Sequence, residues 1–211
     1  MSETQQTPTV QVYADYVCPF CYLGYASLDQ YREEREEPLE TDWHPFDLRA
    51  GKRNADGSID HSVDDGKDEE YFEEARRNVE RLAEKYDAEM TQTLVKDVDS
   101  LDAQRVAWRA REEYPEAFEA FHRSVFDALW EDGRDIGDAD VLKGLASEAG
   151  IPESFVEETL ADESSEADLE DAFRNAQQTG ITGVPTFVSE DNHAARGAVP
   201  PEQLRRLVEG A

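Results

Sequence analysis

The stretch "DYVCPFCYLG", residues 15–24, holds both cysteines of this 211-residue chain, Cys18 and Cys21, with Pro19 and Phe20 between them. Such a pair has three interpretations: a redox device, half of a metal site, or two small buried hydrophobic side chains. Two thiols in a chain long enough to bury a core are not needed for stability. In a reducing cytosol such a pair is more often catalytic or metal-binding than structural.

The residues on both sides of the cysteines predict a strand, a helix and a second strand. Residues 9–16 alternate, which gives the strand one apolar face and puts Tyr13 and Asp15 on the other. A helix follows from Pro19 to about residue 37, and residues 39–46 form the next strand. The order β-α-β normally implies parallel strands in one sheet.

The position of Cys18 just ahead of the helix predicts a reactive thiol. Unpaired N–H groups and the helix dipole at a helix start favour a thiolate over a thiol. Pro19 suits the first helical position, and Cys21 returns to the same face three residues later. Cys18 would attack a client disulfide, and Cys21 would resolve the mixed disulfide, or the cycle would run in reverse.

The other two interpretations have less support in the sequence. A zinc site needs four ligands, and the pair supplies two, while the four histidines show no matching spacing. We therefore expect no metal. Two inactive buried thiols are the remaining alternative.

The rest of the chain predicts an all-helical middle and a β-β-α end. Residues 49–70 contain three glycines and many acidic residues, which indicates a mobile acidic connector. Periodic apolar residues then predict helices over 72–86, 100–113, 115–129, 138–149, a short one from 152, and 166–179. Strands are expected at 184–190 and 193–197, before a last helix from Pro200 and Pro201.

Composition sets the expected surroundings. Fifty Asp and Glu residues stand against 21 Lys and Arg, for a formal net charge of −29, so nucleic acid is a poor partner. Acid-rich, lysine-poor globular chains resemble proteins of salt-in halophiles, and we expect the fold to need molar salt. The residues "MSETQQTPTV" show no secretion signal, and no segment is apolar enough to span a membrane. We expect a soluble, cytoplasmic protein.

A second motif, "GITGVPTFV", residues 180–188, places Val184-Pro185 at the mouth of a strand. Together with the cysteine pair it resembles the thioredoxin superfamily, in which a cis-proline loop faces the C-x-x-C helix start. Because 163 residues, mostly helical, separate Cys21 from Pro185, the chain resembles the DsbA branch with its helical insertion. The stretches "CPFCYLG", "PFDL", "SLDAQRVAW", "TGVPTFV" and "RGAVPPEQL" resemble the FrnE-like subgroup of predicted dithiol-disulfide isomerases, over about residues 9–209.

The resemblance implies an α/β, thioredoxin-like fold with a large all-helical insertion domain. Residues 1–48 and 165–211 would form the thioredoxin-like domain and residues 49–164 the insertion. It further implies a thiol-disulfide oxidoreductase or isomerase whose clients are proteins or small thiols, with an unknown recycling partner. No cofactor is implied beyond a redox-active Cys18–Cys21 disulfide.

The resemblance also assigns roles to the site residues. Cys18 would be the nucleophile and Cys21 the resolving thiol. We also expect Pro19 and Phe20, which stand between them, to contact the client. Val184 and a cis-Pro185 would hold the client backbone. The chain departs from the family pattern at Phe20, where Trp is more common, and at Gln104, where many relatives have His.

Two other functions stay open. 2-Hydroxychromene-2-carboxylate isomerases and kappa-class glutathione transferases share this fold, use glutathione, and typically have Ser at the position of Cys18. The second cysteine, Cys21, argues against them. A binding protein whose thiols only sense oxidation is the non-enzymatic alternative, and repeated turnover would exclude it.

Overall fold

The computed structural model describes residues 7–64 and 66–210, and its first elements follow the predicted order. Strand β1 is Thr9–Ala14, helix α1 is Pro19–Glu33 and strand β2 is Glu40–Pro45. Helix α1 ends at Glu33, about one turn before the predicted residue 37. The β-α-β unit is therefore confirmed, with a shorter helix.

Two short strands from the C-terminal part complete a single sheet. Strands β3 (Thr186–Val188) and β4 (Ala194–Arg196) give the order β2-β1-β3-β4. β1 pairs parallel with β2 and antiparallel with β3, and β3 pairs antiparallel with β4. Because β1 and β3 are neighbours, the segments next to them, residues 15–18 and 183–185, meet at one end of the sheet.

Helices cover the sheet on both faces. α1 and the last helix, α8 (Pro201–Glu209), share a hydrophobic core with the apolar face of β1. On the other face Tyr13 packs with Ala176 and Ile181, at the end of α7 (Glu163–Gln178). Tyr13 and Asp15 are 7% and 0% exposed. The second face of this strand is therefore buried as well, because the end of α7, distant in sequence, packs against it at Tyr13.

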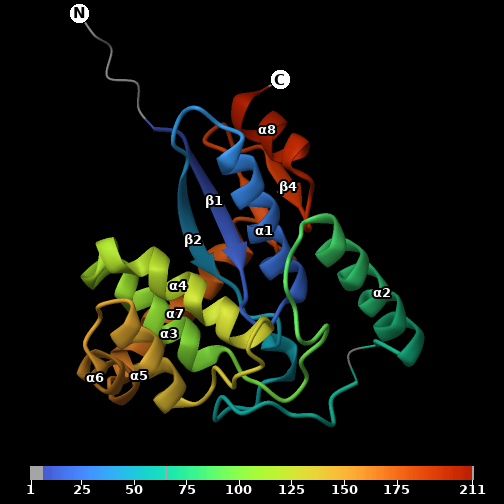
Figure 1. The fold of residues 1–211 in the computed structure, drawn as a ribbon. Helices are drawn as coiled ribbons and strands as arrows, with labels where there is room; N and C mark the ends of the chain where they lie inside the picture. Colours follow the sequence, from blue (N-terminus) through green and yellow to red (C-terminus); the bar gives the residue numbers. More distant parts are fainter. Residues whose placement is uncertain (1–6, 65, 211) are drawn as a thin grey trace, which may run out of the picture.

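The middle of the chain is helical, as predicted, and falls into two groups (Figure 1). Helices α3–α6 gather at the lower left of that view, whereas α2 stands apart from them at the right. α2 packs on α1, where Leu23 meets Val79, Leu82 and Tyr86. The bounds are α2 (Glu69–Lys85), α3 (Leu101–Glu113), α4 (Pro115–Trp130), α5 (Ala139–Glu148) and α6 (Glu153–Ala161).

Helix α7 begins earlier than the predicted residue 166. The side chain of Asp162 accepts a hydrogen bond from the N–H of Ser164 at 2.9 Å, which caps a helix starting at Glu163. The helix thus runs through residue 165, where the domain boundary was predicted. The division into residues 1–48 and 165–211 against 49–164 stays a prediction, and residues 1–6 and 211 lie outside the described part.

A buried histidine links α4 to the segment that carries the cysteines. The Nδ1 atom of His122 lies 2.7 Å from the hydroxyl of Tyr16, and its Nε2 atom lies 2.9 Å from the hydroxyl of Tyr25. Burial, and then the charge of Arg123, lower the pKa of His122 well below its ordinary value. The imidazole is therefore neutral, and the two hydroxyls hold it in place.

The connector after β2 has more structure than predicted. It contains a short 3₁₀ helix, η1 (Ala50–Lys52), and a β-bridge between Arg53 and Ile59. The N–H of Asp60 also donates to the carbonyl of Lys52 at 2.7 Å. The first half of the predicted mobile segment 49–70 is thus folded back on itself by hydrogen bonds.

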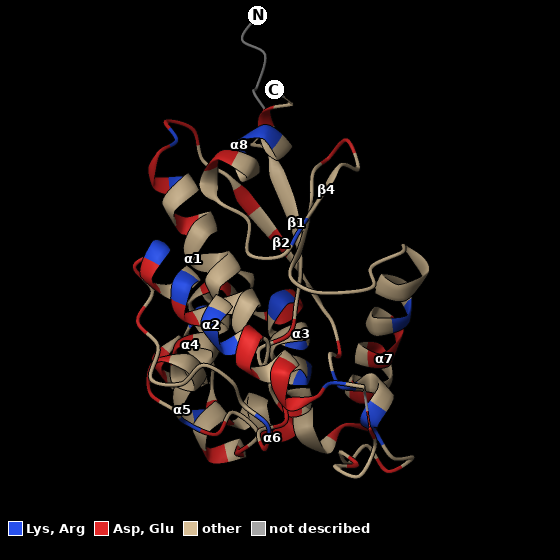
Figure 2. Ribbon diagram, turned by 90° about the vertical axis from the view of Figure 1, so that its right-hand side faces the viewer, with Lys and Arg blue, Asp and Glu red and all other residues tan. Residues whose placement is uncertain are grey.

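The surface reflects the acidic composition. Figure 2 shows Asp and Glu residues spread over the helices, with Lys and Arg interspersed among them. No helix in the described part of the chain is both long and apolar enough to cross a membrane.

Candidate active site

Cys18 stands at the start of α1, as the sequence predicts. It is the N-cap residue, with an extended backbone (φ −91°, ψ 113°), and Pro19 opens the first turn. The carbonyl of Cys18 accepts hydrogen bonds from the N–H groups of Cys21 and Tyr22, at 3.0 and 3.3 Å. The Cys18 side chain makes no capping hydrogen bond, so its sulfur is available for other partners.

Cys21 lies beneath Cys18 and is cut off from solvent. Both residues are free thiols, and Cys18 is 3% exposed while Cys21 is 0% exposed. Burial raises the pKa of the Cys21 thiol well above its ordinary value, and a hydrogen bond with the Cys18 side chain raises it further. Cys21 is therefore protonated until another group removes its proton.

The second predicted motif faces the first. The Val184–Pro185 peptide bond is cis, as the resemblance implies. The thiol of Cys18 donates to the carbonyl of Val184 at 3.7 Å, across 166 residues of sequence. Six residues after Cys18, on α1, a Cβ added to Gly24 would lie 3.1 Å from the side chains of Pro185 and Phe187. Glycine at this position thus allows α1 to approach the Val184–Pro185 segment.

Asp15, which the sequence placed on the less apolar face of the strand, is a buried carboxyl group beside the cysteines. Its two oxygens accept hydrogen bonds from the N–H groups of Val17 (3.2 Å) and Leu48 (2.8 Å) and from the hydroxyl of Ser100 (2.5 Å). Burial raises the pKa of Asp15 to about 6, although these hydrogen bonds oppose the change. The charge of Asp15 in turn contributes to the raised pKa of Cys21, so the two groups interact.

Cys18 opens into a cleft of about 480 Å³. Val17, Pro19, Phe20 and Val184 line it around Cys18. Four of the six predicted site residues thus line the cleft, and the other two, Cys21 and Pro185, do not. The connector and the start of α2 form the opposite wall, with the segment before α3. That wall consists of Leu48, Arg49, Lys52, Ile59, His61, Val63, Asp64, Lys67, Tyr71, Phe72, Ala75, Leu94, Val95 and Lys96.

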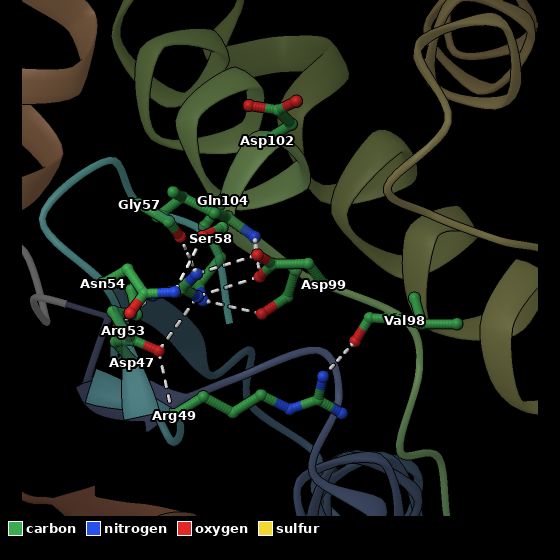
Figure 3. A network of polar contacts seen from close by, with 12 residues as sticks. Asp47, Arg49, Arg53, Asn54, Gly57, Ser58, Val98, Asp99, Asp102 and Gln104 are labelled. Atoms are coloured by element: carbon green, nitrogen blue, oxygen red, sulfur yellow. Dashed lines mark hydrogen bonds and ion pairs between the residues drawn. The ribbon is translucent and has the colours of Figure 1, made fainter. Parts of the chain in front are cut away.

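Two arginines of the connector, Arg49 and Arg53, bind the segment before α3 and so join the two parts of this wall (Figure 3). The guanidinium of Arg53 donates to Asp47 at 2.6 Å and to Asp99 at 2.7 and 2.8 Å. Burial alone would raise the pKa of Asp99, but Arg53 outweighs it and holds that pKa below its usual range. Arg49 donates to the carbonyls of Val95 and Val98 at 2.9 and 2.5 Å. The base of the cleft wall is therefore fixed by hydrogen bonds.

The structure brings the predicted residues together and adds groups that sequence reasoning missed. Cys18, Cys21, Val184 and Pro185 converge at one end of the sheet, where Cys18 is only 3% exposed. Asp15 was missed because its alternation suggested the polar side of a strand, yet it stands in the same short stretch as the cysteines. The cationic residues of the cleft wall were missed because most of them lie in a connector rich in acidic residues, and such a composition indicates a solvent-exposed segment.

Comparison with known sequences identifies a family. The model of the family described as "DSBA-like thioredoxin domain" matches residues 9–209. A curated relative from Bacillus subtilis (strain 168), the uncharacterized protein YwbO, is 28% identical over 186 residues, covering 88% of each chain.

Comparison with solved structures gives the same architecture. A probable DsbA oxidoreductase from Streptomyces coelicolor has a TM-score of 0.78 at 25% identity, covering 96% of this chain and 89% of that one. A 2-hydroxychromene-2-carboxylate isomerase has a TM-score of 0.70 at 19% identity, covering 94% and 92%. The cytosolic disulfide reductase DsbM from Pseudomonas aeruginosa, solved with GSH, has 0.60 at 21%, covering 94% and 92%. The predicted α/β, thioredoxin-like fold of the DsbA type is confirmed.

Proposed function

This chain belongs to the DSBA-like thioredoxin domain family, and on that premise we propose that it is a thiol-disulfide oxidoreductase that works through Cys18 and Cys21. The observation that carries the proposal is the position of Cys18. Cys18 is the N-cap residue of α1, borders a cleft, and has its thiol 3.7 Å from the Val184 carbonyl, with Cys21 hydrogen-bonded to it. The FrnE-like subgroup and the halophilic origin belong to the same proposal.

The exchange proceeds in two steps. The Cys18 thiolate attacks a client disulfide, forms the mixed disulfide and releases one client thiolate. The Cys21 thiolate then attacks the Cys18 sulfur, forms the Cys18–Cys21 disulfide and releases the second client thiolate. Two electrons pass to the client, and the protons of the two cysteine thiols balance those taken up by the released thiolates. The reverse sequence oxidises a client dithiol.

Asp15 supports the second step. Cys21 is buried and its pKa is raised, so it needs a proton acceptor when it attacks. A carboxyl group with a pKa of about 6 is mostly ionised at neutral pH and yet basic enough to take a proton. We assign Asp15 this role, with Ser100 and Leu48 holding it in place.

The client contacts follow from the cleft. Pro19 and Phe20 line it beside Cys18, and Val184 lines it from the opposite segment. Val184 and Pro185 would hold the client backbone against the sulfur, as the family resemblance implies. No cofactor is required beyond the two thiols, and the clients are disulfides of proteins or small thiols in the cytoplasm.

The experiment is a trap combined with a turnover assay. Cys21→Ser should accumulate mixed disulfides through Cys18, which reducing-agent release and mass spectrometry would identify, whereas the Cys18→Ser control should trap none. The wild type should reduce insulin repeatedly with dithiothreitol as the electron source. A protein that reacts once and stops would be an oxidation sensor, and the proposal would be wrong.

A glutathione-dependent isomerase or transferase is the second candidate function. The structural likeness to a 2-hydroxychromene-2-carboxylate isomerase supports it at the level of the fold. Such an enzyme needs no second thiol, so Cys21→Ser would retain full activity in an isomerase assay with glutathione. Loss of turnover in Cys21→Ser, together with trapped mixed disulfides, favours the oxidoreductase.

A further inference from the structure

The cleft beside Cys18 reverses the charge balance of the chain. The chain has 50 acidic and 21 basic residues, and only five of the latter are lysines. Among the described residues that line the cleft, Arg49, Lys52, Lys67 and Lys96 are cationic and Asp64 is acidic. Three of the five lysines therefore border one cleft, next to the proposed nucleophile.

The structure holds several of these cations at the cleft by specific contacts. The ammonium of Lys96 lies 4.4 Å from the centre of the Phe72 ring, and that of Lys67 lies 5.7 Å from the centre of the Tyr71 ring. Arg49 donates through its guanidinium to two backbone carbonyls, which hold it beside the cleft, and its charge also acts on the carboxylate of Asp99. A positive field inside a cleft attracts anions even on a chain of net negative charge.

The size and access of the cleft point to a small substrate. Its volume of about 480 Å³ lies within the range of small-molecule sites, roughly 300–1,000 Å³. Cys18 is only 3% exposed, so the bulk of a folded protein has little access to its sulfur. The exposed large apolar side chains of the described residues, Leu48, Val63 and Tyr71, all border this cleft. They offer contact to the carbon skeleton of a ligand.

We propose that the cleft selects small disulfides that carry carboxylates, with the Arg49, Lys52, Lys67 and Lys96 side chains attracting the negative groups toward Cys18. The inference rests on the proposed function and names its substrate class. The reduced protein and the disulfide RSSR give the Cys18–Cys21 disulfide and two RSH. The two electrons come from the cysteine thiols, and their two protons balance those of the released thiols.

The test is a single-turnover comparison of three small disulfides of different charge. Reduced protein is mixed with dithiodiglycolate (dianionic), hydroxyethyl disulfide (neutral) or cystamine (dicationic) at one fixed KCl concentration. Iodoacetamide stops the reaction, and mass spectrometry counts the remaining thiols. Each rate is divided by the rate of the same disulfide with dithiothreitol, which removes differences between leaving groups. We expect the order dianionic, neutral, dicationic, with a smaller spread as KCl is raised.

Lys96→Gln is the informative variant, and Lys85→Gln is its matched control. Both lysines lie against an aromatic ring, Lys96 on Phe72 and Lys85 on Tyr86 at 5.4 Å, and both changes lower the net charge equally. Only Lys96 lines the cleft. At low ionic strength, removing one unit charge that lies about 4 Å from a charged substrate changes the rate by about fivefold. Lys96→Gln should slow the dianionic substrate by that factor and leave the neutral one unchanged, and Lys96→Arg should restore the rate.

The outcomes separate this inference from the proposed function. If no disulfide reacts faster with the wild type than with Cys18→Ser, the proposed function itself is wrong. If the disulfides react but cystamine equals or exceeds dithiodiglycolate, the charge selection alone is refuted. Equal effects of Lys85→Gln and Lys96→Gln would also refute it, because net charge would then be the cause. Faster reaction with the disulfides of insulin than with dithiodiglycolate would refute the preference for a small substrate.

Discussion

Replacing Asp15 with asparagine should remove one component of the pH dependence of stability. Burial raises the pKa of Asp15 from 3.8 to about 6. This difference of about 2 corresponds to on the order of 3 kcal/mol. Because the pKa in the folded state lies above the unfolded value, the ionised carboxylate destabilises the fold above about pH 6. That penalty declines as the pH falls and is absent below 3.8.

Urea unfolding of the wild type and Asp15→Asn, at pH 8 and pH 4 with KCl held constant, measures this component. Subtracting the free energy of unfolding of one protein from that of the other cancels the contributions of the other carboxylates, which both proteins share. Between pH 8 and pH 4 the wild type should gain on the order of 2–3 kcal/mol relative to the variant. A difference that stays constant to within about 0.5 kcal/mol would refute the assignment of a buried, titrating carboxyl to this position.

The same variant tests the role of Asp15 in exchange. If Asp15 accepts the proton of Cys21, Asp15→Asn should slow the resolution of a preformed Cys18 mixed disulfide by about 100-fold at neutral pH. The pH dependence of resolution near 6 should also disappear. Asp127→Asn is the matched control, because burial and the nearby Glu131 also raise the pKa of Asp127 to about 6, yet Asp127 lies on α4 and, unlike Asp15, is not among the groups that shift the pKa of Cys21. Unchanged or faster resolution in Asp15→Asn would exclude the proton acceptor role.

Three further predictions concern packing, the buried histidine and salt. Gly24→Ala should destabilise the protein by about 1–3 kcal/mol, since the added carbon meets Phe187 at 3.1 Å. In contrast, Gly144→Ala in α5, where the nearest atom is 3.9 Å away, should stabilise it by about 0.5–1 kcal/mol, and urea unfolding compares the two. Because the pKa of His122 is lowered on folding, the wild type should lose stability relative to His122→Gln as the pH falls below 6.5, and equal slopes from pH 7 to pH 5 would contradict this. The thermal midpoint, followed by circular dichroism, should rise from about 0.2 M to multimolar KCl, because salt screens the net charge of −29; a constant midpoint would exclude the need for salt.

The sequence predicted the features that depend on local chemistry. A cysteine followed by proline after a strand predicts the start of α1, and the structure has Cys18 as the N-cap with Pro19 in the first turn. The pairing of Cys18 with Val184 came from a resemblance, because nothing in the spacing of two segments 166 residues apart states that they meet.

The features that the sequence did not predict depend on distant partners. Burial of Tyr13 and Asp15 required α7 and Ser100, whose positions follow from the tertiary fold. The same holds for the connector, in which Arg53 has a carboxylate partner, Asp99, that is 46 residues away. A run of acidic residues with glycines gives no local sign of such a partner.

The anchoring of the connector has an evolutionary consequence. Arg53 secures the beginning of the cleft wall to Asp47 and Asp99, while the residues that reach the cleft mouth, such as Val63 and Lys67, come after that anchor. The residues up to Asp60 belong to the anchor through the Arg53–Ile59 bridge and the bond from Asp60 to Lys52, so the part after Asp60 can diverge by substitution with the least effect on the sheet and the cysteine pair. Substitutions at His61, Val63, Asp64 and Lys67 can therefore change the lining of the cleft while Arg49, Lys52 and Lys96 stay in place.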